Sequence, residues 1–185
     1  MRVIAGIAKG RVLKAVPGQQ TRPTSDKVKE AIYSMIGPYF SGGVVLDLFA
    51  GTGGLGIEAC SRGAERAIFV DSESKSVAVI KHNLQVTGME AIAEVYRNDA
   101  LRAVKVLARR NLKLQLVFLD PPYRMTNMME YIDLFLQHNM LEADAYIVVE
   151  HDAKVTYPDS YDSIHVKKVA NYGDTTVTIY QYCSE

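Results

Sequence analysis

Apolar runs and amphipathic segments alternate along most of this chain. Short apolar runs typical of buried strands occur at 44–49, 66–70, 92–97, 114–119 and 145–150. Apolar residues recur at helical spacing between them, at about 55–62, 73–87, 100–111 and 126–138. Strands that alternate with helices form βαβ units with right-handed crossovers. The pattern therefore predicts an α/β fold built on a parallel sheet of five strands.

The C-terminal part of the chain departs from this alternation. Two further strands are predicted at 163–170 and 175–182, without a helix between them. The residues that join them, Asn171-Tyr172-Gly173-Asp174, favour a β-hairpin. The parallel sheet is therefore expected to end in an antiparallel pair.

The N-terminal part predicts a small extension of the same fold. Residues 2–15 alternate loosely and break at Lys9-Gly10, which indicates a hairpin or an extended arm. Thr24 is placed to cap a helix that runs to about Gly37. The chain is thus expected to begin with a hairpin and a helix.

Charge is unevenly distributed between this extension and the rest of the chain. The 21 basic and 21 acidic residues cancel overall. Residues 1–30, however, hold seven basic residues and two acids, a net charge of +5, which leaves −5 for 31–185. A basic segment indicates a polyanionic partner, although a solvated hairpin face accounts for it equally well. We interpret residues 1–40 as a basic arm within one fold, and 41–185 as the main domain.

Composition excludes several classes of protein. The 185 residues are 48% hydrophobic and 23% charged, which is ordinary for one globular domain. Cys60 and Cys183 lie far apart and outside metal-ligand spacing, which fits a reducing cytoplasm and argues against a zinc site. No apolar signal sequence opens the chain, and no uncharged run approaches the ~18 residues of a membrane span. A cytoplasmic protein without a membrane partner is therefore expected.

Asp120-Pro121-Pro122-Tyr123 directly follows the fourth predicted strand. Two consecutive prolines have fixed φ angles and no amide hydrogens, so the chain must leave the sheet there in a rigid form. Ligands of open α/β sheets bind beyond the carboxyl ends of the strands. A carboxylate, a backbone carbonyl and an aromatic ring at that edge suit a planar ligand with an NH2 group. Core packing is the alternative role for Tyr123, and its place beyond the strand argues against it.

A glycine-rich turn follows the first predicted strand. Gly51, Gly53 and Gly56 match the pattern G-x-G-x-x-G, and Asp71 lies 20 residues after Gly51. Glycines in such a turn let a ligand approach the backbone, and the amides at a helix N-terminus can donate to it. Because dinucleotide-binding proteins share this pattern, an NAD-dependent dehydrogenase remains open on the motif alone.

An acid also lies near the carboxyl end of each of the first four predicted strands: Asp47, Asp71, Asp99 and Asp120. Such a row would repel a pyrophosphate but suits the ribose hydroxyls, adenine amine and cationic amino acid part of S-adenosylmethionine. We expect Asp71 to accept the ribose hydroxyls and Asp47 to face the ammonium through water. Asp99, or the amide of Ala100, would meet the adenine. Each acid could instead cap a helix, and for Asp99 that role is nearly as well supported.

At these residues the chain resembles a known family over its whole length. The order of the glycine-rich turn, the strand-end acids and Asp120-Pro121-Pro122-Tyr123 is similar to that of Rossmann-like, S-adenosylmethionine-dependent amino-methyltransferases. The RsmD-type 16S ribosomal RNA guanine-N2 methyltransferases are resembled more narrowly, at residues 2–6 with 9–11, 22–30, 54–59 and 172–176. The motif at Asp120 indicates amino methylation but not guanine, so the narrower assignment depends on the arm and the C-terminal turn.

The resemblance implies a class I methyltransferase fold, with a mostly parallel seven-stranded sheet, a C-terminal antiparallel hairpin and an N-terminal hairpin and helix. It implies methyl transfer from S-adenosylmethionine, without a metal, to the N2 amine of a guanine in 16S rRNA. The partner would be 16S rRNA within an assembling small ribosomal subunit, and a monomer is expected. The implied cofactor-binding residues are Asp47, Phe49, Gly51, Thr52, Gly53, Asp71, Ser72, Asp99 and Ala100.

The implied chemistry is mainly a matter of positioning. Asp120 would accept one amine hydrogen and the Pro121 carbonyl another, and Asp120 would be the first proton acceptor. Pro122 would hold the loop rigid, and Tyr123 would stack on the base, which is typically worth ~1–3 kcal/mol. The residues expected to contact RNA are Lys9, Arg11, Arg22, Lys27 and Arg124.

Other activities remain open from the sequence. DNA adenine-N6 methylation usually needs a separate target-recognition region, for which only the N-terminal arm is available. Protein glutamine-N5 methylation would place an amide in the Asp120 pocket. An NAD-dependent dehydrogenase would need a hydride-handling site, which the sequence does not offer. A non-catalytic RNA-binding module would use the arm alone.

Overall fold

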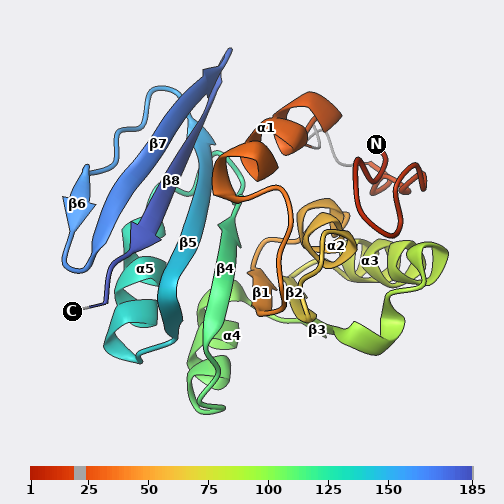
Figure 1. The fold of residues 1–185 in the computed structure, drawn as a ribbon, viewed down its shortest axis with the longest axis horizontal. Coiled ribbons are helices and arrows are strands. Elements are labelled where there is room, and N and C mark those ends of the chain that lie inside the picture. The colour runs from red at the N-terminus through yellow and green to blue at the C-terminus, as the bar shows by residue number, and fades with distance from the viewer. Residues whose placement is uncertain (19–23, 185) are drawn as a thin grey trace.

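Five parallel strands form the centre of the fold, as the alternating pattern predicted (Figure 1). The computed structural model describes residues 1–18 and 24–184. The eight strands of its single sheet lie in the order β3-β2-β1-β4-β5-β8-β7-β6. The parallel strands are β1 (Val44–Asp47), β2 (Arg66–Asp71), β3 (Ala93–Arg97), β4 (Leu114–Leu119) and β5 (Leu141–Asp152).

The C-terminal hairpin is confirmed and extends this sheet. β7 (Ile164–Tyr172) pairs antiparallel with β8 (Thr175–Tyr182), and β8 inserts between β7 and β5. Tyr172 lies opposite Thr175, so only Gly173 and Asp174 form the loop, and Gly173 has a φ of 64°. A two-residue hairpin loop favours glycine at such a left-handed position. The short β6 (Ser160–Tyr161) adds an eighth strand to the seven that the family resemblance implied.

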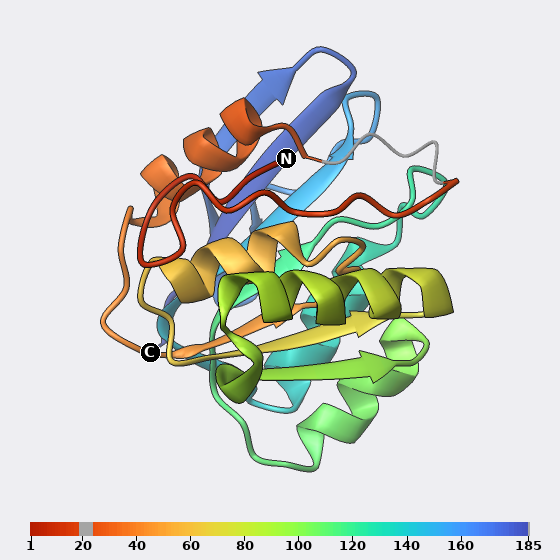
Figure 2. The ribbon, with the colours of Figure 1, turned by 90° about the vertical axis from the view of Figure 1, so that its right-hand side faces the viewer.

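Helices cover both faces of the sheet, because strand side chains alternate between two hydrophobic clusters. On β4, Leu116 and Phe118 face one cluster, whereas Val117 and Leu119 face the other. The first face carries α1 (Asp26–Ile36), α2 (Gly54–Ser61) and α3 (Ser74–Thr87), and the second carries α4 (Ala100–Ala108) and α5 (Met128–Gln137). Figure 2 shows α2 and α3 on one side of the sheet and α4 on the other. A 3₁₀ turn, η1 (Glu90–Ile92), precedes β3.

The predicted N-terminal hairpin is largely irregular. It contains one antiparallel bridge, Arg2 with Val12, and the Val3 amide donates to the Arg11 carbonyl at 2.9 Å. The turn of the hairpin forms a hydrogen bond to α2 instead: the Ala8 amide donates to Ser61 Oγ at 3.0 Å. Hydrogen bonds to the helix thus replace part of the strand pairing that the loose alternation suggested.

The helix cap was predicted one residue too early. α1 begins at Asp26, and Ser25 is its N-cap, with its hydroxyl accepting the Val28 amide at 3.2 Å. The Thr24 hydroxyl instead donates to Glu150. Both residues are good caps by type, so only the tertiary contact of Thr24 distinguishes them.

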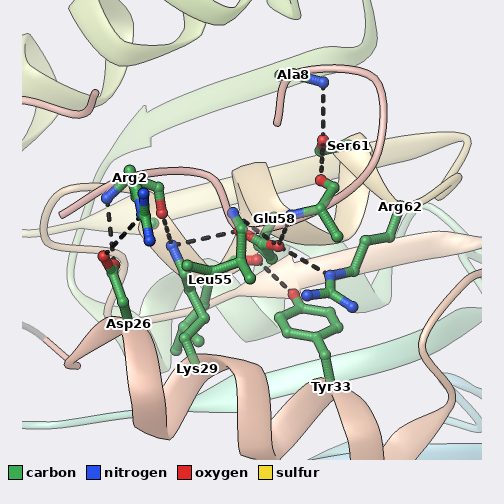
Figure 3. Close-up of polar contacts among 12 residues, drawn as sticks. Arg2, Ala8, Asp26, Lys29, Tyr33, Leu55, Glu58, Ser61 and Arg62 are labelled. Atoms are coloured by element: carbon green, nitrogen blue, oxygen red, sulfur yellow. Dashed lines mark hydrogen bonds and ion pairs between the residues drawn. The ribbon is translucent and has the colours of Figure 1, made fainter. Parts of the chain in front are cut away.

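A buried charge cluster joins the arm, α1 and α2 (Figure 3). Glu58 on α2 lies 3.3 Å from Lys29 Nζ and 2.9 Å from Arg62 Nε, and the Glu58 and Lys29 side chains are both fully buried. The Ile4 and Ala5 amides also donate to the Glu58 carboxylate, at 3.0 Å each. Lys29 Nζ in turn donates to the Arg2 carbonyl at 2.6 Å. Glu58 is therefore the anion that fixes the arm on the domain.

Tyr33 completes this cluster from α1. Its hydroxyl donates to the Leu55 carbonyl at 2.6 Å, and the Arg62 guanidinium lies 4.7 Å from the centre of its ring. Burial lowers the pKa of Lys29, while the neighbouring Glu58 carboxylate opposes that shift. A buried lysine needs such a partner to remain charged.

We predict that Glu58→Ala destabilises the fold by about 3–5 kcal/mol, because it leaves two buried cations and two arm amides without their acceptor. Glu58→Gln keeps an acceptor of the same shape and should cost less. Urea unfolding measures both, with the exposed Glu65→Ala as the matched control. A loss below ~1 kcal/mol in Glu58→Ala would show that the cluster does not hold the arm.

Candidate active site

A cleft of about 540 Å³ lies at the carboxyl ends of the central strands. All four residues of Asp120-Pro121-Pro122-Tyr123 line it. It also contains every predicted cofactor-binding residue except Gly53, namely Asp47, Phe49, Gly51, Thr52, Asp71, Ser72, Asp99 and Ala100. The structure therefore brings the two sequence motifs together in one cavity.

Strand alternation places four carboxylates on one face of the sheet. Asp71, Asp47, Asp120 and Glu150 lie at the carboxyl ends of the neighbouring strands β2, β1, β4 and β5. Each comes two residues after a core residue of the face that carries α1, α2 and α3; these core residues are Phe69, Val45, Phe118 and Val148. Side chains two apart on a strand share a face. The same face that packs the helices thus ends in a row of acids.

The glycine-rich turn after β1 is held by those acids. Asp71 Oδ2 accepts the Gly51 amide at 2.8 Å, and Asp47 Oδ2 accepts the Gly56 amide at 3.0 Å. The amide of Gly54 donates to Thr52 Oγ1 at 3.2 Å. A dinucleotide-binding turn offers such amides to a pyrophosphate. Here they are engaged by protein oxygens, two of them carboxylates, so the turn does not suit a pyrophosphate.

Two glycines of this turn have specific structural reasons. Gly53 is the N-cap residue of α2 and has a left-handed φ of 79°. A Cβ on Gly56 would lie 2.4 Å from a ring carbon of Phe69, so only glycine lets α2 pack this closely on β2. The match to G-x-G-x-x-G at Gly53 and Gly56 therefore reflects turn geometry and helix packing, and Gly53 does not line the cleft.

Asp71 and Asp99 have different surroundings. The other oxygen of Asp71, Oδ1, accepts the Glu73 amide at 2.9 Å, so backbone amides fix both oxygens at the wall of the cleft. Asp99 is the N-cap of α4, where its Oδ1 accepts the Arg102 amide at 3.0 Å. The helix-cap role that the sequence left open for Asp99 is thus present, and Asp99 also lines the cleft.

Asp47 is the most deeply buried of these acids, with 2% of its surface exposed. Burial raises the pKa of Asp47 to about 7, the Gly56 amide opposes that shift, and the charge of Asp71 adds to it. A group poised near neutral pH changes its charge readily when a cation arrives beside it. The cleft is therefore electrostatically prepared for a cationic ligand.

The loop of Asp120-Pro121-Pro122-Tyr123 is tied to the C-terminal hairpin. The Met125 amide donates to the Pro122 carbonyl at 2.9 Å, which closes the loop. The hydroxyls of Tyr123 and Thr175 lie 2.7 Å apart, and Thr175 is the first residue of β8. Tyr123 is 56% exposed, so it is not a core residue. Its ring is held at the rim of the cleft by a residue of the hairpin motif.

Sequence reasoning missed two residues next to Asp120. Thr24 Oγ1 donates to Glu150 Oε2 at 2.9 Å and lies 3.5 Å from Asp120 Oδ2. Burial, the charge of Glu150 and the charge of Asp47 raise the pKa of Asp120 well above its usual range, which the Thr24 hydroxyl opposes. Glu150 could have been found, because it ends the fifth predicted strand as the other acids end theirs. Thr24 gave no such signal.

The arm forms one wall of the cleft, through Met1, Ala15 and Val16. The Asn83 side chain on α3 holds it there by accepting the Lys14 amide at 2.8 Å and donating to the Thr52 carbonyl at 2.9 Å. One side chain thus joins the arm to the glycine-rich turn. Any ligand that fills the cleft would contact the arm as well as the domain.

The predicted RNA-contacting residues are only partly gathered at the cleft. Arg124 lines it, whereas Lys9, Arg11 and Lys27 are exposed elsewhere on the arm and α1. Arg22 lies outside the described residues. Lys29, although part of the basic N-terminal sequence, is buried against Glu58 and adds nothing to the surface charge.

Two features are absent from the part of the chain that the structure describes. None of the helices there combines the length and the apolar character that crossing a bilayer requires. In the same part of the chain, no three His, Cys, Asp or Glu side chains are grouped as ligands of a metal ion.

Comparison with known proteins gives a family match over nearly the whole chain. Residues 1–181 match the family described as "Conserved hypothetical protein 95". A protein of Bacillus subtilis (strain 168) named "Putative rRNA methyltransferase YlbH" is 50% identical over 181 residues, which cover 98% of each chain. "Ribosomal RNA small subunit methyltransferase D" of Escherichia coli (strain K12) is 32% identical over 184 residues, 98% of this chain and 89% of that protein.

A solved structure agrees with this match. The structure titled "Putative methyltransferase yhhF from Escherichia coli" superimposes with a TM-score of 0.83 and 31% identity, covering 100% of this chain and 99% of that one. The matches confirm the family resemblance that the motifs indicated, and with it the Rossmann-like methyltransferase fold.

The buried Asp47 generates a prediction about pH. Its pKa is about 7 in the folded chain and near 3.8 when unfolded, so its protonated form stabilises the fold. That stability is present below about pH 4 and is lost as pH rises towards 7. Asp47→Asn should keep the bond to Gly56 and abolish this loss of stability. The loss amounts to at most about 4 kcal/mol of unfolding free energy. Urea unfolding of both proteins at pH 5 and pH 8 measures it. A stability difference that does not grow with pH would contradict the raised pKa.

Proposed function

The chain belongs to the family described as "Conserved hypothetical protein 95", and we propose that it transfers a methyl group from S-adenosylmethionine to the N2 amine of a guanine in 16S rRNA. One observation carries the proposal: the carboxylate of Asp120 and its two prolines open into the cleft that also holds the strand-end acids. Relatives named as ribosomal RNA methyltransferases support the substrate class.

The donor set of the cleft fits S-adenosylmethionine. Two backbone amides hold the carboxylate of Asp71 in place. A carboxylate fixed in this way can accept hydrogen bonds from ribose hydroxyls. Asp47 presents a buried acid toward the cationic amino acid part, and Phe49, Ser72, Asp99 and Ala100 line the remaining wall. When bound, this cofactor supplies a methyl group on a positively charged sulfur. Binding of NAD in the same cleft is disfavoured, because the amides of the glycine-rich turn already donate to Asp71 and Asp47.

Asp120 performs the main chemical work of the chain in this proposal. Its carboxylate accepts one hydrogen of the guanine amine, and the carbonyl of Pro121 accepts the other. Both bonds favour a tetrahedral nitrogen, with the lone pair directed at the incoming methyl group. As positive charge develops on the nitrogen, Asp120 stabilises it and receives the proton. The base stacks on Tyr123, whose hydroxyl is held by Thr175.

Binding of RNA falls to the arm and the rim of the cleft. Lys9, Arg11 and Lys27 are exposed, and Arg124 lies at the cleft itself, so they suit contacts with the phosphate backbone. Arg22 completes the proposed set. The target guanine must be unpaired, or be extruded from its stack, to reach Asp120. We place this reaction in the cytoplasm, with a monomer acting on an assembling small ribosomal subunit.

The proposal leaves two related activities as competitors, because an adenine amine or a glutamine amide could also meet Asp120. DNA adenine methylation would need a larger recognition surface than the arm, which is packed on α2 and α3. The relatives' names favour ribosomal RNA over both.

We predict that Asp120→Ala lowers methyl transfer to small ribosomal subunits by about 100-fold or more, because the amine loses its proton acceptor. Affinity for S-adenosylmethionine should stay unchanged, since Asp71 and Asp47 remain. Single-turnover transfer measures the first quantity, and calorimetry with S-adenosylmethionine and with NAD measures the second. Asp133→Ala on α5, remote from the cleft, is the control.

Three outcomes would contradict the proposal. Near-normal transfer by Asp120→Ala would remove Asp120 from the reaction. Tight binding of NAD, with none of S-adenosylmethionine, would remove methyl transfer altogether. Equal transfer to free adenine-rich DNA would reject ribosomal RNA as the substrate.

We predict that the double reversal Lys9→Glu and Arg11→Glu weakens RNA binding and flattens its salt dependence. Each lost phosphate contact lowers the slope of log K against log salt by roughly 0.7–0.9, so the slope should fall by about 1–2. Binding of 16S rRNA fragments at several salt concentrations measures this. Lys105→Glu with Arg109→Glu, two exposed charges on or beside α4, is the matched control. A slope equal to that of the control would exclude the arm from the RNA site.

A further inference from the structure

Thr24 links two carboxylates that belong to different strands. Asp120 follows β4 and Glu150 lies in β5, and the register that pairs Leu119 with Val149 brings the two acids side by side. The Thr24 hydroxyl lies 2.9 Å from Glu150 Oε2 and 3.5 Å from Asp120 Oδ2. All three residues line the cleft. A threonine from the N-terminal segment thus sits between the proposed proton acceptor and a second acid.

The hydroxyl carries one hydrogen and can donate fully to only one of the two acids. The shorter distance assigns that hydrogen to Glu150. The contact with Asp120 becomes a second hydrogen bond when Asp120 itself carries a proton and donates it to Thr24 Oγ1. In that state both bonds point the same way, from Asp120 through Thr24 to Glu150.

We propose that Thr24 and Glu150 take the proton that the reaction releases away from Asp120. This inference rests on the proposed function, because it concerns the proton released by the methylated amine. The proton passes from the amine nitrogen to Asp120. Asp120 then gives a proton to Thr24 Oγ1 while the Thr24 hydroxyl hydrogen passes to Glu150. One proton has moved from nitrogen to Glu150, and Asp120 and Thr24 are restored.

The electrostatics of the cleft agree with this geometry. Burial, then Glu150, then Asp47 raise the pKa of Asp120, and burial raises the pKa of Glu150. The Thr24 hydroxyl donates to Glu150 and opposes the rise in the pKa of that acid. The other charged or titratable groups that line the cleft are Lys29, Asp47, Asp71, Glu73, Asp99, Tyr123, Arg124 and Tyr131. A pair of neighbouring carboxylates of this kind holds a shared proton more tightly than either acid alone.

Variants of Glu150 and of Thr24 should each change the pH profile of methyl transfer. Methyl transfer requires ionised Asp120, so the wild-type rate should rise with pH through the raised pKa of Asp120. Glu150→Gln removes a negative neighbour, so the midpoint of the pH profile should move to lower pH. Thr24→Val removes the hydroxyl between the two acids, so the midpoint should differ from that of the wild type. Thr24→Ser keeps the hydroxyl and should restore the wild-type profile.

Single-turnover transfer to unmethylated small ribosomal subunits, with saturating S-adenosylmethionine, measures these midpoints. Ser25→Ala is the matched control, because it weakens the cap of α1 beside Thr24 and touches neither acid. If Thr24 and Glu150 had only a structural role, their variants would lower the rate at every pH, and the midpoints of the pH profiles would coincide with that of wild type. Coincident midpoints in wild type, Glu150→Gln and Thr24→Val would overturn the inference.

A measurement without substrate separates this inference from the proposed function. Carboxyl ¹³C NMR titration of the cofactor-free protein follows Asp120 and Glu150 directly, with Asp120→Asn and Glu150→Gln for assignment. We expect Asp120 to titrate above the ordinary range in wild type and at lower pH in Glu150→Gln. Titration of Asp120 in the ordinary range, or no change in Glu150→Gln, would overturn the inference. If wild type methylates no guanine but the titration behaves as expected, the proposed function fails while the carboxylate coupling stands.

Discussion

This structure depends on one constraint: several carboxylates lie at one edge of a parallel sheet. Because β2, β1, β4 and β5 are neighbours and run the same way, their terminal acids meet in one cleft. Like charges this close must be offset by hydrogen bonds, or be partly protonated. The structure does both: amides of the glycine-rich turn bind Asp71 and Asp47, and the pKa of Asp47 rises to about 7.

This constraint also explains which ligand the cleft suits. The turn amides that would bind a pyrophosphate instead donate to the acids, and a row of acids suits hydroxyls, amines and a cation. The arm takes part, because Asn83 joins Lys14 to the turn and Glu58 fixes Lys29 and the first residues. The proposed RNA-binding segment and the cofactor wall are therefore one structural unit.

Much of this was predictable from the sequence, and the exceptions have physical reasons. The strand and helix periods, the C-terminal hairpin and the gathering of acids follow from local pattern and from the geometry of parallel strands. The fully buried partnership of Lys29 with Glu58 joins residues 29 positions apart, so the charge count of the N-terminal segment gave no sign that Lys29 is buried. The contact of Thr24 with Glu150 spans 126 positions, so the cap was assigned to Thr24 rather than Ser25.

Mass mapping of 16S rRNA from cells that lack this protein tests the central claim most directly. The acceptor loop at Asp120 can hold an amine of guanine, adenine or glutamine, and this measurement shows directly whether an amine of 16S rRNA is the acceptor. We expect the loss of one N2-methylguanine, restored by the wild-type gene but not by the Asp120→Ala variant. An unchanged set of 16S rRNA methylations would contradict it.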